Sequence, residues 1–168
     1  MLIIFGGLPG TGKTTLSQAL ARHLGAVHVR IDTIEHAITA GDGRPAGEAG
    51  YRVGYAVAED NLRLGRIVIA DSVNPLQITR DAWRAVAGRA DVPWIEVEII
   101  CADADEHRRR VESRGADIPG ARQPTWQEVA AREYQPWHRA HAVIDTTGRT
   151  VEECLAQLSA ALAARRQA

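Results

Sequence analysis

The 168-residue sequence predicts a single α/β domain in which helices cover both faces of a parallel sheet. Short apolar runs alternate along the chain with segments of helical periodicity, which is the pattern of parallel-sheet proteins. A glycine-rich loop joins the first apolar run to the first helical segment. The length is sufficient for one substantial core and short for two domains.

Five apolar runs are the predicted strands. The longest contains Glu96 and Glu98 in alternation, which indicates a strand with one partly solvated face. Ligands of open parallel sheets bind at the carboxyl ends of the strands, so the residues that follow each run are the first candidates for a site. The predicted strands cover residues 1–6, 26–31, 66–70, 93–101 and 141–145.

Helical periodicity fills the intervals between the strands. Thr125 and Thr150 are each followed three residues later by glutamate, which is the pattern of a capping box at a helix start. Residues 40–50 and 115–124 contain glycine and proline and are both predicted to be mobile loops. The predicted helices cover residues 13–24, about 33–39, 51–64, 75–89, 104–114, 125–137 and 150–166.

Composition excludes several classes of protein. A net charge of −1 gives no broad basic surface for a long polyanion, so a nucleic-acid partner is possible through local arginine clusters but is not favoured. Cys101 and Cys154 are typical of buried thiols in a reducing compartment. Because no run of apolar residues reaches membrane-spanning length and no signal peptide is evident, we expect a cytoplasmic protein without a membrane partner. The sequence carries no signal for an oligomeric state.

The most informative segment is Gly7–Thr14, which matches the phosphate-binding pattern G-x-x-x-x-G-K-[ST] at every fixed position. It contains Lys13, the only lysine in the chain. Its glycines allow backbone N–H groups to point at phosphates, and the following helix adds its positive N-terminal end. Lys13 is expected to contact the β- and γ-phosphates and Thr14 to ligate Mg²⁺. The predicted nucleotide-binding residues are Gly7, Gly10, Thr11, Gly12, Lys13, Thr14 and Thr15.

Two aspartates follow predicted strands. Asp32 is a candidate base that orients and deprotonates an acceptor hydroxyl, with a helix N-cap as the structural alternative. Asp71 ends an apolar strand in the manner of a Walker B element and is predicted to hold Mg²⁺ directly or through water. Its structural alternative is a cap for the next helix.

An arginine-rich run between residues 105 and 115 is the third candidate feature. Arg110 and Arg114 lie four residues apart and so share a helix face just before the predicted loop 115–124. Cations that close over a transferring phosphoryl group neutralise its developing charge. These two arginines are therefore the predicted lid residues, with Arg108, Arg109 and Arg122 as second choices. The structural alternative is a solvated helix face.

Other conspicuous residues are expected to have structural roles. His107 and His138 are predicted at the surface, because the histidines show no metal-binding spacing. Tyr51 and Tyr55 lie one helical turn apart and are predicted to pack, with a place in an acceptor pocket as the alternative.

The order of these motifs resembles the small P-loop kinases of the AAA-domain group, which includes the polynucleotide 5′-hydroxyl kinase domain, chloramphenicol phosphotransferase and zeta toxins. The resemblance covers residues 1 to about 150. It implies a P-loop NTPase three-layer αβα fold, with a five-stranded parallel sheet of nucleoside-monophosphate-kinase type and an arginine-bearing lid at roughly residues 110–124. It also implies catalytic roles for Lys13, Asp32, Arg110 and Arg114.

The function that the resemblance implies is an ATP- and Mg²⁺-dependent kinase that transfers the γ-phosphate to a hydroxyl of a small molecule, an antibiotic or a metabolite. Glu35 stands where several of these kinases have an arginine, which disfavours an anionic acceptor. A polynucleotide or nucleoside 5′-hydroxyl kinase is the enzymatic alternative. A nucleotide-dependent switch or binding module is the alternative of another class, and an acceptor-facing Asp32 argues against it.

Overall fold

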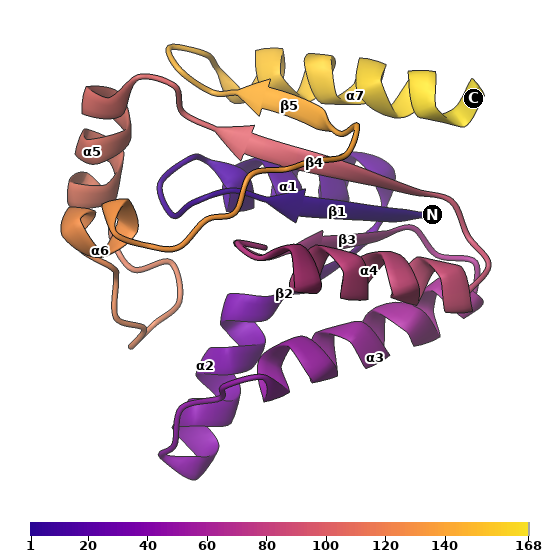
Figure 1. The fold of residues 1–168 in the computed structure, drawn as a ribbon, viewed down its shortest axis with the longest axis horizontal. Coiled ribbons are helices and arrows are strands. Elements are labelled where there is room, and N and C mark those ends of the chain that lie inside the picture. The colour runs from indigo at the N-terminus through magenta and orange to yellow at the C-terminus, as the bar shows by residue number, and fades with distance from the viewer. Residues whose placement is uncertain (168) are drawn as a thin grey trace.

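Five parallel strands form the centre of the structure (Figure 1). They are β1 (Leu2–Gly6), β2 (Val27–Arg30), β3 (Val68–Asp71), β4 (Trp94–Ile100) and β5 (Ala142–Asp145). Their order in the sheet is β2-β3-β1-β4-β5, so the first strand of the chain occupies the middle. Each strand overlaps a predicted run, and the five-stranded parallel sheet is confirmed. The computed structural model describes residues 1–167, apart from the side chains of residues 42, 166 and 167.

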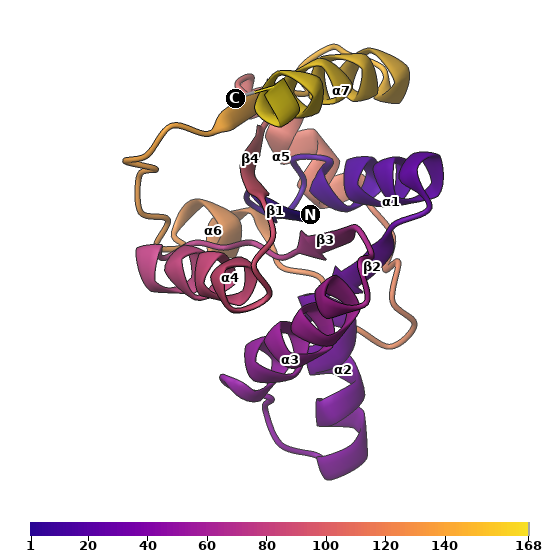
Figure 2. The same cartoon turned by 90° about the vertical axis from the view of Figure 1, so that its right-hand side faces the viewer.

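Helices cover both faces of this sheet. They are α1 (Lys13–Leu24), α2 (Ile31–Asp42), α3 (Ala49–Arg63), α4 (Gln77–Arg89), α5 (Ala104–Ser113), α6 (Trp126–Ala130) and α7 (Val151–Gln167). Helices α1 and α7 lie on one side of the sheet, and α3 and α4 lie on the other (Figure 2). The three-layer αβα arrangement is therefore the one that the sequence predicts.

The alternation of side chains along β1 builds two separate cores. Ile3 and Phe5 pack with apolar residues of α1 and α7, whereas Leu2 and Ile4 pack with residues of α3 and α4 that include Trp83. All five side chains are fully buried. Because both faces of the strand are covered, its sequence is continuously apolar instead of alternating with polar residues.

The carboxyl ends of the strands meet at one edge of the sheet, and the candidate site lies there. The glycine loop follows β1 at this edge, and α5 and α6 lie beside it (Figure 1). Because the strands are parallel, the residues that follow β2, β3, β4 and β5 also lie at this edge, near the glycine loop. Among residues 1–167, no helix is both long and apolar enough to cross a membrane.

The predicted helix over residues 125–137 is wrong in extent, because α6 ends at Ala130. Its capping box at Thr125 is present. The chain that follows is held in an irregular conformation by the buried Arg80 of α4, whose guanidinium donates to the carbonyls of Gln135 and Pro136 at 2.6 and 3.0 Å. Those carbonyls are thus bound by a side chain from another helix, and Pro136 has no N–H for a helical hydrogen bond.

The same irregular segment changes the surroundings of β4. Glu96 is buried and pairs with Arg139 at 3.1 Å, and Glu98 pairs with His141 at 3.1 Å. The expected solvated face of this strand is therefore covered. The predicted loop 40–50 is also shorter than expected, because α2 extends to residue 42 and α3 begins at residue 49.

Candidate active site

The loop between β1 and α1 is shaped as an anion cradle. Gly7, Gly10 and Gly12 have φ values of 142°, 87° and 87°, a region that residues with a Cβ rarely adopt. A Cβ on Gly7 would lie 2.3 Å from the carbonyl oxygen of Ile99, so the loop also needs glycine there for space. Among residues 1–167, no acceptor binds the following backbone N–H groups: those of Gly10, Gly12, Lys13, Thr14 and Thr15. Unpaired N–H groups at a helix start are the donors that bind phosphate.

Lys13 and Asp71 form a buried ion pair beneath this loop. The Lys13 Nζ lies 2.7 Å from Asp71 Oδ1, and the two side chains are 6% and 0% exposed. Ser17 Oγ donates to Asp71 Oδ2 at 2.9 Å, and His28 Nε2 lies 3.3 Å from the same oxygen. Burial alone would raise the pKa of Asp71, but the Lys13 ammonium and the hydrogen bonds lower it well below the ordinary value. Asp71 is thus ionised at neutral pH, and Lys13 balances its negative charge.

A single cavity of about 1020 Å³ opens above the loop. It extends along the carboxyl edge of the sheet in two directions from the P-loop. Toward β5 its walls come from α1, α5 and the start of α7; toward β2 they come from α2 and residues 113–124. A cavity with a phosphate cradle between two arms suits two ligands whose reacting groups meet near Lys13 and Thr14, which both line it.

Asp32 lines the arm of the cavity beside β2. It lies in the first turn of α2, whose N-cap is Arg30, so the N-cap interpretation of Asp32 is wrong. Its side chain is 44% exposed and therefore available to a ligand. Glu35, one turn further along α2, lines the same arm. Burial raises the pKa of Glu35, the negative charge of Asp32 raises it further, and Arg132 opposes the shift.

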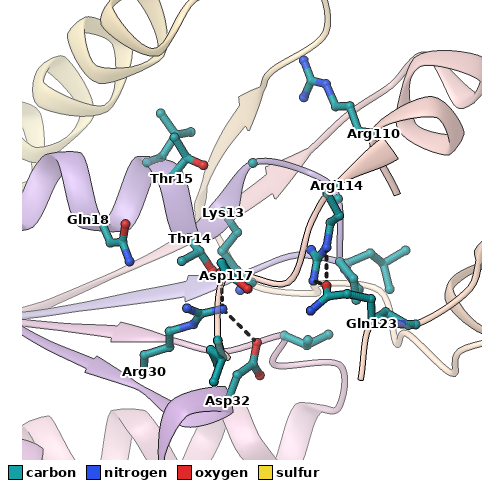
Figure 3. Close-up of a pocket in the computed structure, with 18 of the residues that line it drawn as sticks. Lys13, Thr14, Thr15, Gln18, Arg30, Asp32, Arg110, Arg114, Asp117 and Gln123 are labelled. Atoms are coloured by element: carbon teal, nitrogen blue, oxygen red, sulfur yellow. Dashed lines mark hydrogen bonds and ion pairs between the residues drawn. The ribbon is translucent and has the colours of Figure 1, made fainter. Parts of the chain in front are cut away.

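The predicted lid segment covers this arm. Asp117 in the segment accepts a hydrogen bond from Arg30 at 2.6 Å, and the same guanidinium nitrogen lies 3.8 Å from Asp32 (Figure 3). At the tip of the segment, a Cβ on Gly120 would lie 3.7 Å from the ring of His36 on α2. The segment therefore closes the arm from the lid side and is joined to the end of β2 by an ion pair.

The two predicted lid arginines both line the cavity, whereas Arg108 and Arg109 do not. Arg110 donates to the side chain and backbone carbonyl of Thr146, at 2.7 and 2.9 Å. Arg114 is exposed and, within residues 1–167, donates only to Gln123, near the far end of the lid segment (Figure 3). Arg110 is thus hydrogen-bonded to the loop after β5, whereas Arg114 is bonded to an exposed side chain of the lid segment.

Sequence reasoning missed the wall beside β5. This wall is formed by residues that directly follow the last strand, and the strand-end rule that located Asp32 and Asp71 would have found them. It also missed His107, which is 7% exposed and contacts Pro9, so its predicted surface position is wrong. Tyr51 and Tyr55 pack against the core around Trp83, as predicted. The β5-side wall comprises Thr146, Arg149, Thr150, Val151 and Cys154.

A family model described as an AAA domain matches residues 2–135, which is most of the chain. The chain belongs to the AAA domain family. Similar solved structures include a provisionally assigned kinase from Chloroflexus aurantiacus, which has 24% identity and a TM-score of 0.76 over 95% of this chain and 96% of that one. The APS kinase CysC of Mycobacterium tuberculosis has 22% identity and a TM-score of 0.73, with 96% of each chain covered. A gluconokinase from Sinorhizobium meliloti has 17% identity and a TM-score of 0.67, with 96% of this chain and 90% of that one covered.

These likenesses show that this AAA-domain protein has the fold of small P-loop kinases. No curated protein sequence matches the chain. The residues fit a nucleotide, because the unpaired N–H groups of the cradle supply anion donors. Among the described residues, no group of three His, Cys, Asp or Glu side chains could hold a metal ion. Mg²⁺ in nucleotide sites takes one or two protein ligands and completes its shell with phosphates and water, so Thr14 and Asp71 together suffice as predicted ligands.

Proposed function

We propose that this protein is an ATP- and Mg²⁺-dependent kinase that phosphorylates a hydroxyl of a small molecule. The observation that carries the proposal is the shared cavity, which has the phosphate cradle and Lys13 between its two arms and Asp32 in the arm beside β2. The similar APS kinase was solved in complex with AMPPNP and APS, so this fold accommodates a nucleotide and a small molecule together. When bound, ATP would supply the phosphoryl group and Mg²⁺ would reduce its negative charge.

Each residue has a separate task in this proposal. Thr14 and Asp71 would hold Mg²⁺, with Lys13 released from Asp71 to the phosphates. Asp32 would orient the acceptor hydroxyl and take its proton, because it is exposed to the cavity and its ion-pair partner Arg30 is 3.8 Å away. Arg114 and Arg110 would neutralise charge on the phosphates from the lid side.

The acceptor arm favours a small molecule over a polynucleotide. The lid segment reaches α2 and is joined to β2 by the Arg30–Asp117 ion pair, which encloses the arm. Glu35 places a second carboxylate beside Asp32, and no side chain within residues 1–167 donates a hydrogen bond to it. Two neighbouring carboxylates repel a phosphate backbone and accept hydrogen bonds from hydroxyl or ammonium groups. An acceptor with several such groups is therefore the favoured substrate.

The test is transfer of labelled phosphate from ATP to a panel that contains polyols, amino alcohols, carboxylated sugars and a 5′-hydroxyl oligonucleotide. We expect one or more small hydroxyl compounds to be labelled. Asp32→Asn should then lower the rate by about a hundredfold or more while ATP affinity changes little, which is the usual scale for a positioned base. Labelling of the oligonucleotide alone would replace the proposal with the polynucleotide alternative.

Thr33→Ala is a matched control, because Thr33 is adjacent on α2, exposed, and does not line the cavity. Its rate should stay close to that of the unmodified protein. The switch or binding module would be favoured instead by two results together: tight nucleotide binding without transfer to any member of the panel, and ATP hydrolysis in Asp32→Asn at the rate of the unmodified protein.

A further inference from the structure

His107 of α5 holds the phosphate loop from outside the cavity. Its Nε2 lies 2.8 Å from the carbonyl oxygen of Pro9, and the side chain is 7% exposed. Since a carbonyl can only accept, the ring nitrogen must carry the hydrogen, which assigns the Nε2–H form of the ring or the imidazolium. Pro9 and Gly10 line the cavity, whereas His107 does not. The histidine therefore binds the loop on the side that faces away from the cavity.

The planarity of the peptide unit turns this contact into an effect on the phosphate site. The Pro9–Gly10 peptide is trans, because the described chain contains no cis peptide bond. In a trans peptide the C=O and the next N–H point in opposite directions. When His107 draws the Pro9 carbonyl outward, the Gly10 N–H is directed toward the cavity, where no protein group accepts its hydrogen bond.

Packing around the ring fixes its direction. A Cβ on Gly10 would lie 2.5 Å from Val111 Cγ2 and 3.2 Å from His107 Cδ2, so α5 contacts the loop directly at this glycine. On the other side, the ring of Trp126 meets the imidazole edge-on with centroids 5.2 Å apart. Trp126 begins α6, directly after the lid segment. The imidazole is therefore held between the phosphate loop and the helix that follows the lid.

We infer that His107 is a positioning residue for nucleotide binding: it orients the Pro9–Gly10 peptide so that the Gly10 N–H is ready to bind a phosphate oxygen. The inference rests on the nucleotide-binding part of the proposed function and not on the identity of the acceptor. An unbound loop whose donor already has the bound orientation loses less entropy when the ligand arrives, which increases affinity.

The experiment measures ADP binding by titration calorimetry, without any acceptor, in three variants of the full chain. His107→Phe keeps an aromatic ring beside Trp126 but removes the donor. We expect ADP to bind roughly 3- to 10-fold more weakly, the scale of one hydrogen bond. His107→Gln retains an N–H donor at similar reach, and affinity should return to within about twofold. Arg108→Ala, on the exposed face of the same helix, should bind as the unmodified protein does.

A purely structural role for His107 would give a different result. In that case His107→Phe and His107→Gln would lower the melting temperature alike, and ADP affinity would not follow the presence of a donor. The amide resonance of Gly10 in ¹⁵N-labelled protein provides a second readout: it should shift in His107→Phe before ligand is added and remain near its original position in His107→Gln. Unchanged ADP affinity in a folded His107→Phe protein overturns the inference. Failure of the unmodified protein to bind ADP would instead overturn the proposed function.

Discussion

The buried Lys13–Asp71 ion pair makes a quantitative prediction for the protein without ligand. Asp71→Asn removes the negative charge 2.7 Å from Lys13 Nζ and leaves an ammonium that is 6% exposed without its counterion. Breaking a buried pair in this way destabilises a protein by about 3–5 kcal/mol. In a protein of this size each kcal/mol corresponds to roughly 2–4 °C, so the melting temperature should fall by about 6–20 °C.

The assay is thermal and urea unfolding followed by circular dichroism, with an exposed ion pair as the control. Arg108 and Glu112 lie 2.9 Å apart but are 54% and 49% exposed, so Arg108→Ala should change the free energy of unfolding by less than about 1 kcal/mol. The double variant Lys13→Met/Asp71→Asn should be destabilised by less than the sum of the two single variants, because it leaves no unpaired charge. If Asp71→Asn loses no more stability than Arg108→Ala, the reasoning about this pair is refuted.

The same pair alters how a lysine substitution must be interpreted. Lys13→Ala removes a phosphate ligand, but it also leaves the Asp71 carboxylate buried with Ser17 as its remaining hydroxyl donor. Loss of ATP binding in that variant would therefore combine a direct effect with a change in stability. Measuring the unfolding free energy beside the affinity separates the two.

Two further predictions follow from the charged groups. Asp71 has a depressed pKa, so its contribution to stability is present above the ordinary carboxyl pKa near 4 and is lost as the pH falls toward the lower pKa of the folded state. The melting temperature measured between pH 2 and 7 should therefore drop on the acid side. This drop should be shallower in Asp71→Asn. Arg114→Ala should lower the rate of phosphoryl transfer by on the order of a hundredfold or more with little change in melting temperature. Arg110→Ala should lower both the rate and the melting temperature, because it removes the hydrogen bonds to Thr146. If Arg110→Ala, Arg114→Ala and Arg108→Ala all change the rate equally and little, the arginines of this segment form a solvated helix face and not a lid.

The parts of the fold that sequence reasoning predicted are those that local pattern determines. The continuous apolar run of β1 indicates a strand that is buried on both faces. The glycines of the following loop indicate backbone conformations that only glycine adopts easily. Asp71 was located because a strand followed by a carboxylate is a local signal. In each case the physical cause lies within a few residues of its effect.

The missed features depend on partners far away in the sequence. Helix α6 ends early because the chain after it is held by Arg80, which binds the carbonyls of Gln135 and Pro136 from 55 and 56 residues upstream. His107 is buried because α5 packs on the phosphate loop, and 98 residues separate it from Pro9. A pattern within one segment carries no information about such contacts, and both residues have the appearance of ordinary surface charges on their helices.

Asp32 and Asp71 show how the surroundings distinguish residues that the sequence treats alike. Asp71 is the last residue of β3, and Asp32 follows the neighbouring strand β2, whose Arg30 pairs in register with Asp71. Asp71 is fully buried and bound by Lys13 and Ser17, so it can exchange partners with a cation but is not exposed to an acceptor. Asp32 lies two residues beyond the end of β2, is 44% exposed, and lines the cavity. A base must meet its substrate and a metal ligand must stay ionised, and these opposite requirements favour the acceptor for Asp32 and Mg²⁺ for Asp71.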